Sequence, residues 1–136
     1  MPETAATATV ALTDLPAVGQ PLDGGTFAGL TTKKDGTHCA VVLLAAVPDK
    51  PMKWKPAMAW AAEQGAELPT RAVSALLYHQ LKATHFAEGG WYWTSEKHEA
   101  DGAYAWYQGF FSGHQYNYRT SYEARVRAVR LIPLSA

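Results

Sequence analysis

The amino-acid sequence predicts an α+β domain in which two helices flank a twisted antiparallel sheet. Three observations predict this class. Apolar residues recur with helical spacing at about residues 55–64 and 71–83, and a run of short aromatic strands follows Gly89-Gly90. An apolar run with a turn signal, of the kind that forms a β-hairpin, precedes both helices. Two helices followed by several strands are typical of α+β domains.

The first 25 residues predict an extended N-terminal arm that serves as a docking segment. Residues 1–14 are rich in alanine and threonine without a helical period, and residues 15–36 are dense in glycine and proline. Such an arm is mobile unless it lies against something. Two alternatives are open: the arm packs on its own domain, or it docks on a partner or a neighbouring copy. The domain itself is expected to span residues 26–136.

A β-hairpin is predicted over residues 26–46. Thr26–Thr32 is the candidate first strand, and His38–Ala46 is a continuous apolar run typical of a buried strand. The Asp35-Gly36 pair between them suits a type I′ turn. The single cysteine, Cys39, lies in the second strand and is expected to be buried and inert.

Helix signals flank both helical segments. In the first helix, Pro56 suits the first turn and Gly65 ends the helix. In the second helix, Thr70 is the predicted N-cap residue. The helical spacing of this second segment predicts one buried face, made of Val73, Leu76, Leu77 and Leu81.

Four strands are predicted after the helices, at residues 91–95, 103–111, 114–118 and 124–131. Successive side chains of a strand point to opposite faces, so about half of the aromatic residues here should be core. We expect Trp93, Trp106 and Val129 to be buried.

Composition excludes several classes of function. Twelve basic and twelve acidic residues cancel in this 136-residue chain, which gives no general attraction to nucleic acid or to an anionic membrane. The longest apolar stretch, residues 40–47, is too short to span a bilayer. The N-terminus has no basic start followed by an apolar run, so we expect no signal peptide and synthesis in the host cytoplasm.

Neither catalysis nor metal binding is predicted. The common nucleophile, zinc-protease and phosphate-loop motifs are absent from the sequence. Glu96, His98, Glu99 and Asp101 lie in one loop and resemble a calcium loop only loosely. A solvated loop is the favoured interpretation, and we expect no cofactor.

Residues 114–123 form the candidate binding surface because they contain no aliphatic side chain. Tyrosine, asparagine, serine and arginine make adaptable binding surfaces, in which rigid rings are combined with hydrogen-bonding groups. The alternative is a polar hairpin whose tyrosines shield its base. The residues predicted to bind a ligand are His114, Tyr116, Asn117, Tyr118, Arg119, Ser121, Tyr122 and Arg125.

Five short motifs occur in a characteristic order: Leu68-Pro69-Thr70-Arg71, Trp91-Tyr92-Trp93-Thr94-Ser95, Ala105-Trp106-Tyr107, Phe110-Phe111-Ser112-Gly113 and Val126-Arg127-Ala128-Val129-Arg130. In these motifs, residues 53–132 resemble the DUF1566 family, which includes the C-terminal domain of the Legionella collagen-like adhesin. The resemblance implies a C-type-lectin-like fold, related to formylglycine-generating enzymes and to retroelement-diversified phage receptor-binding proteins. It also implies ligand contacts in the C-terminal region, and hydrogen-bonded arginines at Arg127 and Arg130.

The resemblance and the candidate surface together predict a non-catalytic recognition module of a phage or prophage virion. Its partner would be a cell-surface glycan or protein receptor, and the arm would contact other virion or fibre subunits. We expect a homo-oligomer or a multi-copy assembly. The alternative is a structural decoration or tail subunit whose aromatic face makes subunit contacts. An enzyme of the formylglycine-generating type is disfavoured, because the lone cysteine, Cys39, lies outside the matching residues.

Overall fold

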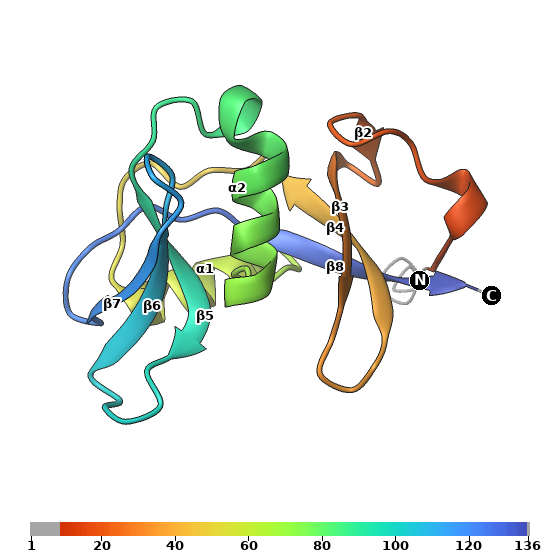
Figure 1. The fold of residues 1–136 in the computed structure, drawn as a ribbon. Helices are drawn as coiled ribbons and strands as arrows, with labels where there is room; N and C mark the ends of the chain where they lie inside the picture. Colours follow the sequence, from red (N-terminus) through yellow and green to blue (C-terminus); the bar gives the residue numbers. More distant parts are fainter. Residues whose placement is uncertain (1–8, 136) are drawn as a thin grey trace.

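Two β-sheets with a helix between them form the architecture of the protein (Figure 1). The structure, a computed structural model, describes residues 9–135. The larger sheet has the strand order β1-β8-β4-β3-β2, and the smaller sheet has the order β5-β6-β7. The strands are β1 (Val10–Ala11), β2 (Pro21–Leu22), β3 (Gly25–Thr32), β4 (His38–Leu44), β5 (Trp91–Lys97), β6 (Tyr104–Gly109), β7 (Gln115–Arg119) and β8 (Val129–Ser135).

The predicted α+β class and the two helices are confirmed. The helices are α1 (Trp54–Glu63) and α2 (Arg71–His85), and a short 3-10 turn, η2, covers Leu12–Asp14. The prediction of one antiparallel sheet needs correction, since the strands divide between two sheets and β1 pairs with β8 in parallel. The division follows from α2, which packs apolar residues against strands of both sheets.

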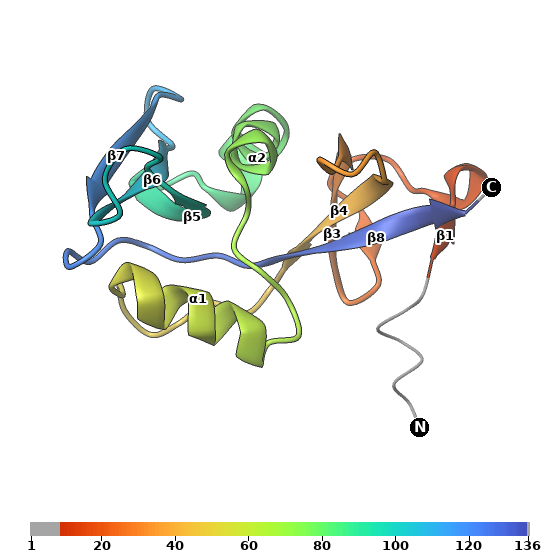
Figure 2. The ribbon, with the colours of Figure 1, turned by 90° about the horizontal axis from the view of Figure 1, so that it is seen from below.

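The central position of β4 in the larger sheet explains why its sequence is continuously apolar. Val41 and Leu43 pack in the core around α2, whereas Val42 and Leu44 pack in a second core that contains residues of α1. Figure 2 shows α1 and α2 on opposite sides of the chain that leads into β8. Because both faces of β4 are buried, no polar alternation appears in its sequence.

The two Asp-Gly pairs make different turns, and this corrects the prediction for residues 35–36. Asp23 and Gly24 both have positive φ, at 51° and 82°, as a type I′ turn requires. They join β2 to β3 through the pair Leu22 and Gly25. In the longer turn between β3 and β4, Gly36 has a positive φ of 91° and Asp35 does not.

Burial agrees with most of the predicted core. Val73, Leu77, Trp93 and Val129 are buried as predicted. Two residues are only half-buried, against expectation: Leu76, whose side chain lies beside Gly29 of β3, and Trp106, which one arginine covers. Helical and strand periodicity identifies the inward-facing side of an element, but not where neighbouring elements end.

The last strand begins later than predicted, at Val129 instead of Ala124, and ends at Ser135. Residues 124–128 are held by isolated bridges, Met52 with Ala124 and Tyr92 with Arg125. Val126 and Ala128 are nevertheless buried in the core near α1. The alternating pattern of this segment therefore reflects burial without a regular strand ladder.

The described part of the predicted arm pairs with its own domain. Val10 and Ala11 lie opposite Leu134 and Ser135, and β2 extends the larger sheet beyond β3. The remainder of the predicted arm, residues 1–8, lies outside the described residues. A role for the arm in contacts with other subunits stays a prediction.

Candidate functional site

Strand β7 divides the predicted ligand-binding residues between the two faces of the smaller sheet. Tyr116 lies opposite Tyr107 in the β6–β7 pairing, and Tyr118, two residues on, shares its face. Asn117 and Arg119 point to the other face. Residues 114–123 therefore do not form one continuous surface, because neighbours along a strand cannot share a face.

One face carries a cluster of aromatic rings that we call the aromatic surface: Trp91, Tyr107, Tyr116, Tyr118 and Tyr122. The ring centroids of Trp91 and Tyr118 are 4.5 Å apart, and those of Tyr118 and Tyr122 are 4.7 Å apart, both with edge-to-face geometry. Trp91 also lies 4.8 Å from Tyr107. Tyr116 is 62% exposed and Tyr122 is 47% exposed, so the outer rings of this cluster are open to solvent.

His114 lies at one end of the aromatic surface. Its Nε2 atom is 3.4 Å from the Tyr107 hydroxyl, and its Nδ1 atom is 2.6 Å from the Ser112 hydroxyl. Burial raises the pKa of Tyr107, and the nearby Tyr118 and Tyr116 raise it further. The Tyr107 hydroxyl is therefore neutral near pH 7 and can both donate and accept a hydrogen bond.

Three neighbouring hollows, which we together call the trench, adjoin the aromatic surface at Tyr118 and Tyr122. Residues 47–53 line one wall and residues 121–126 line the other. Tyr92 lines the first hollow, Trp91 lines the second, and Tyr118 and Tyr122 line the third. Tyr92 points to the opposite face of the sheet from Trp91 and packs against Phe86 and Phe110. The first and second share Pro51 and Arg125, and the second and third share Glu123.

The predicted residue Arg125 lies where the first and second hollows meet. Its Nη1 atom is 3.4 Å from a carboxylate oxygen of Glu88. Hydrogen bonding to Tyr92 and then to Glu88 raises the pKa of Arg125, so its charge is permanent. Because both ends of this ion pair are exposed, it adds little stability, and the guanidinium remains accessible to a ligand.

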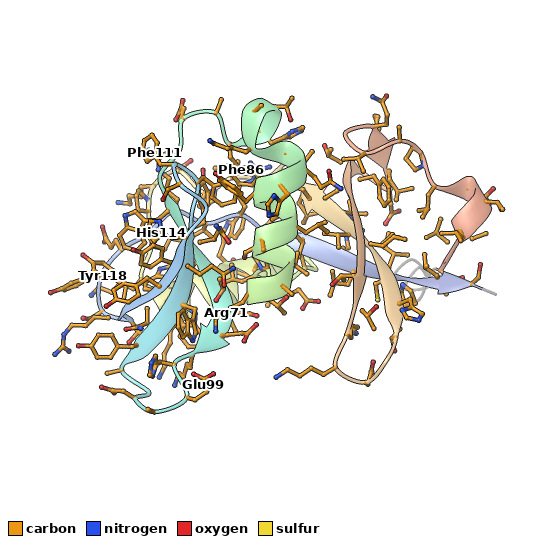
Figure 3. All side chains as sticks on the ribbon, viewed as in Figure 1. Arg71, Phe86, Glu99, Phe111, His114 and Tyr118 are labelled. Carbon is orange, nitrogen blue, oxygen red and sulfur yellow. The ribbon has the colours of Figure 1, made fainter. Side chains whose placement is uncertain are left out.

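The opposite face of the sheet has a different role. The guanidinium of Arg71 lies 3.6 Å above the Trp106 ring, and Arg71 Nε donates to Gln115 Oε1 at 2.9 Å. Gln115 Nε2 donates in return to the Arg71 carbonyl and to Gln108. This network fastens β7 to the start of α2, and Arg71 and Tyr118 lie on either side of the sheet (Figure 3).

The structure thus brings together five of the eight predicted residues: His114, Tyr116, Tyr118, Ser121 and Tyr122. Asn117, Arg119 and Arg125 point to the far face, where Arg119 is placed over Tyr104 and Arg125 pairs with Tyr92. Sequence analysis missed Trp91 and Tyr107 as surface residues, because aromatic residues in a strand were assigned to the core. The register of β7 against β6 was the missing information.

The predicted arginine hydrogen bonds of the closing segment are present. Arg127 Nη2 donates to the Leu44 carbonyl at 2.8 Å, and Arg130 contacts both the side chain and the carbonyl of Asp23. Burial lowers the pKa of Arg127. These arginines connect β8 and the residues just before it to other strands of the larger sheet, and they do not reach the aromatic surface.

The polar loop between β5 and β6 is held by its own hydrogen bonds, in which Asp101 accepts from the Ala103 amide and His98 accepts from the Ala100 amide. Glu96 lies at the end of β5 instead of in this loop, and it accepts from the Arg71 amide at the start of α2. Within residues 9–135, no three His, Cys, Asp or Glu side chains are grouped as a metal site. In this same part of the chain, no helix is long and apolar enough to cross a membrane.

A comparison with models of known protein families found no match to this chain, and a comparison with curated proteins found none. The resemblance to the DUF1566 family therefore depends on the five motifs alone.

Proposed function

We propose that this protein is a non-catalytic recognition module with a C-type-lectin-like fold, which binds a cell-surface glycan or protein through the aromatic surface and the adjoining trench. The DUF1566 resemblance supports the lectin-like assignment. It also favours display on a phage or prophage virion in several copies, with residues 1–25 in contact with other subunits.

The observation that supports recognition most strongly is the aromatic surface itself. Tyrosine rings bury large area at low entropic cost, and their hydroxyl groups supply hydrogen bonds. Tyr118 and Tyr122 stand edge to face, and Tyr107 holds His114 at its rim. A surface of rigid rings with polar edges suits a ligand that is itself part apolar and part hydroxylated or amidic.

The aromatic residues also support the alternative of a structural subunit. Phe111, at the turn between β6 and β7, is 73% exposed and has no polar group. Large exposed aromatic side chains are enriched at protein contacts. In that case the aromatic surface would be covered in an assembly and not available to a receptor.

Binding of the purified protein to a glycan array and to receptor-bearing cells tests the proposal. Tyr116→Ala removes an exposed ring from the aromatic surface, and Asn117→Ala is the matched control on the opposite face. We expect Tyr116→Ala to weaken binding by more than about 1 kcal/mol and the control to leave it unchanged. Equal effects of both variants would contradict the assignment of the site.

Light scattering distinguishes the structural alternative. If Tyr116→Ala and Phe111→Ala convert an oligomer to a folded monomer and no receptor binding is found, these exposed aromatic residues form a subunit contact.

A further inference from the structure

Strand β7 forms one edge of the smaller sheet, because the strand order of that sheet is β5-β6-β7. In Figure 2 it is the strand of this sheet that lies farthest from the larger sheet. Backbone N–H and C=O groups along the outer side of an edge strand are available for pairing with another strand.

Three residues of β7 direct their backbone N–H and C=O groups away from β6. In an antiparallel pair, residues that exchange hydrogen bonds alternate with residues that do not. The Gly109 amide donates to the His114 carbonyl at 2.8 Å, so the register makes Tyr116 and Tyr118 the next bonded residues of β7. The outward residues are therefore Gln115, Asn117 and Arg119. Within residues 9–135, one of their backbone groups is used, the Arg119 carbonyl, which accepts from the Tyr122 amide at 3.0 Å.

Strand β7 lacks the features that protect most sheet edges. Natural edge strands are very short, bulged or covered, or they carry proline or lysine. β7 has five residues without proline or lysine, and it pairs with β6 without a bulge. The other edge strands differ: β1 and β2 have two residues each. The outer side of β5 is covered, since the Trp93 amide donates to the Arg125 carbonyl at 3.1 Å.

The large exposed aromatic side chains of the described residues all lie along β7 or near its ends. Phe111, which precedes the strand, is 73% exposed, Tyr116 within it is 62% exposed, and Tyr122 beyond it is 47% exposed. Aromatic residues are enriched where proteins contact one another. The edge therefore combines unpaired backbone groups with side chains that suit an interface.

We infer that β7 pairs antiparallel with β7 of a second copy of this chain, which joins two three-stranded sheets into one six-stranded sheet. The resulting dimer is two-fold symmetric, with the same strand contributed by both copies. This inference goes beyond the recognition function and does not depend on which ligand the aromatic surface binds.

One register of this pairing uses the outward groups of all three residues. With the two-fold axis at Asn117, each Asn117 lies opposite its counterpart, and each Gln115 lies opposite Arg119 of the second copy. Arg119 is the one charged side chain of the strand. Because each Arg119 meets a neutral amide, this register avoids the like-charge pair that would destabilise a sheet.

The aromatic side chains match in the same register. Tyr116 lies directly opposite Tyr118 of the second copy, and aromatic cross-strand pairs stabilise antiparallel sheets. The start of β7 in one copy also lies beside the end of β7 in the other, so Phe111 and Tyr122 come to the same end of the pair. An unrelated extended peptide has the backbone groups for this edge, but the chain's own β7 also supplies the matching side chains.

Sedimentation velocity across a series of protein concentrations tests the inference. We expect the native sequence to change from monomer to dimer as the concentration rises. Asn117→Lys and Asn117→Asp each place like charges opposite each other at the two-fold axis, and each should weaken self-association by at least about fivefold. An equimolar mixture of the two variants should associate again, because opposite charges then meet. Gln64→Lys adds the same charge at an exposed position at the end of α1 and should have no effect.

Hydrogen exchange of the native sequence locates the contact without a substitution. The amides of Gln115, Asn117 and Arg119 should exchange more slowly at high protein concentration than at low concentration. The Tyr116 amide, which is bonded to β6 in both states, should change little. A thermal melt of each Asn117 variant checks that it folds.

Three outcomes would overturn the inference. The native sequence stays monomeric at the highest soluble concentration, the mixture of Asn117 variants associates no better than either variant alone, or the outward amides are protected equally at all concentrations. If the protein is monomeric and still binds a glycan or receptor, the recognition function stands without the dimer.

Discussion

Tyr116 and Tyr118 share one face of β7, but their surroundings differ. Tyr116 is largely exposed, whereas Tyr118 is half-buried against Trp91 and belongs to the border of the core near α1. Two tyrosines on the same face of a strand can therefore differ in role. One serves mainly binding, whereas the other serves both packing and binding.

Truncation of these two tyrosines should separate the two roles. Tyr116→Ala should change the free energy of unfolding by no more than about 0.5 kcal/mol, as exposed substitutions usually do. Tyr118→Ala should lower it by more than about 1 kcal/mol, because its ring packs on Trp91. Urea denaturation of both variants measures this. Equal losses of stability would show that Tyr116 also packs in the folded protein.

Cys39 is fully buried in β4, and burial raises the pKa of its thiol above the usual value of 9.0. The unfolded thiol ionises first as pH rises, so the unfolded state binds fewer protons than the native state above about pH 9. Stability should then decrease with rising pH. Urea denaturation at pH 7.5 and 9.5 should show a steeper loss for the native sequence than for Cys39→Ala. An identical pH dependence would indicate an accessible thiol.

At the scale of elements, the start of α2 is held by a side-chain cap. Thr70 Oγ1 accepts a hydrogen bond from the Val73 amide at 3.1 Å, as its position after Pro69 predicted. Thr70→Ala should lower the free energy of unfolding by about 1 kcal/mol, and Thr70→Ser should retain most of it because the hydroxyl remains. Urea denaturation provides the values. If Thr70→Ser is as destabilising as Thr70→Ala, the cap is not the source of the effect.

The sequence was sufficient for elements whose signals are local. The helix cap, the helical stripe and the apolar run of β4 each depend on residues close together in the chain. The sequence was insufficient where the local structure depends on an element that is distant in the chain. Residues 124–128 follow strand periodicity, yet they are bridged to Met52 and Tyr92 instead of forming a ladder. The two Asp-Gly pairs look alike, but the register of β2 on β3 selects the type I′ turn for Asp23-Gly24.

The candidate site shows the same limit. The richness of residues 114–123 in tyrosine identified most of the aromatic surface, because composition alone reports binding-type side chains. The contribution of Trp91 could not be found in this way, since only the fold places β5 and residues 121–126 side by side. The walls of the trench come from segments about seventy residues apart in the chain.

At the scale of the whole molecule, α2 joins the two sheets into one cooperative unit. Leu77 is buried in the core that contains Val41 and Leu43 of β4 and Phe110 beyond β6. Leu77→Ala should lower the free energy of unfolding by about 2–5 kcal/mol. Both sheets should still unfold together, so near-ultraviolet and far-ultraviolet circular dichroism should give one midpoint. Two separate midpoints would show that the smaller sheet unfolds independently of α2.

Four of the five tryptophan indole N–H groups provide the most direct test of the central claim, that the ligand binds at the aromatic surface and the trench. Trp54 and Trp93 donate their indole N–H groups to the carbonyls of Thr94 and Met52. Trp106 lies under Arg71 on the opposite face, and Trp91 lines the trench.

The measurement is a ¹H–¹⁵N correlation spectrum recorded during titration with the array glycan that binds most tightly. We predict that the Trp91 indole signal and the amides of residues 121–126 shift most, while the Trp106 signal stays in place. A shift of the Trp106 signal with the Trp91 signal unchanged would contradict the account and place the ligand on the face that carries Arg71.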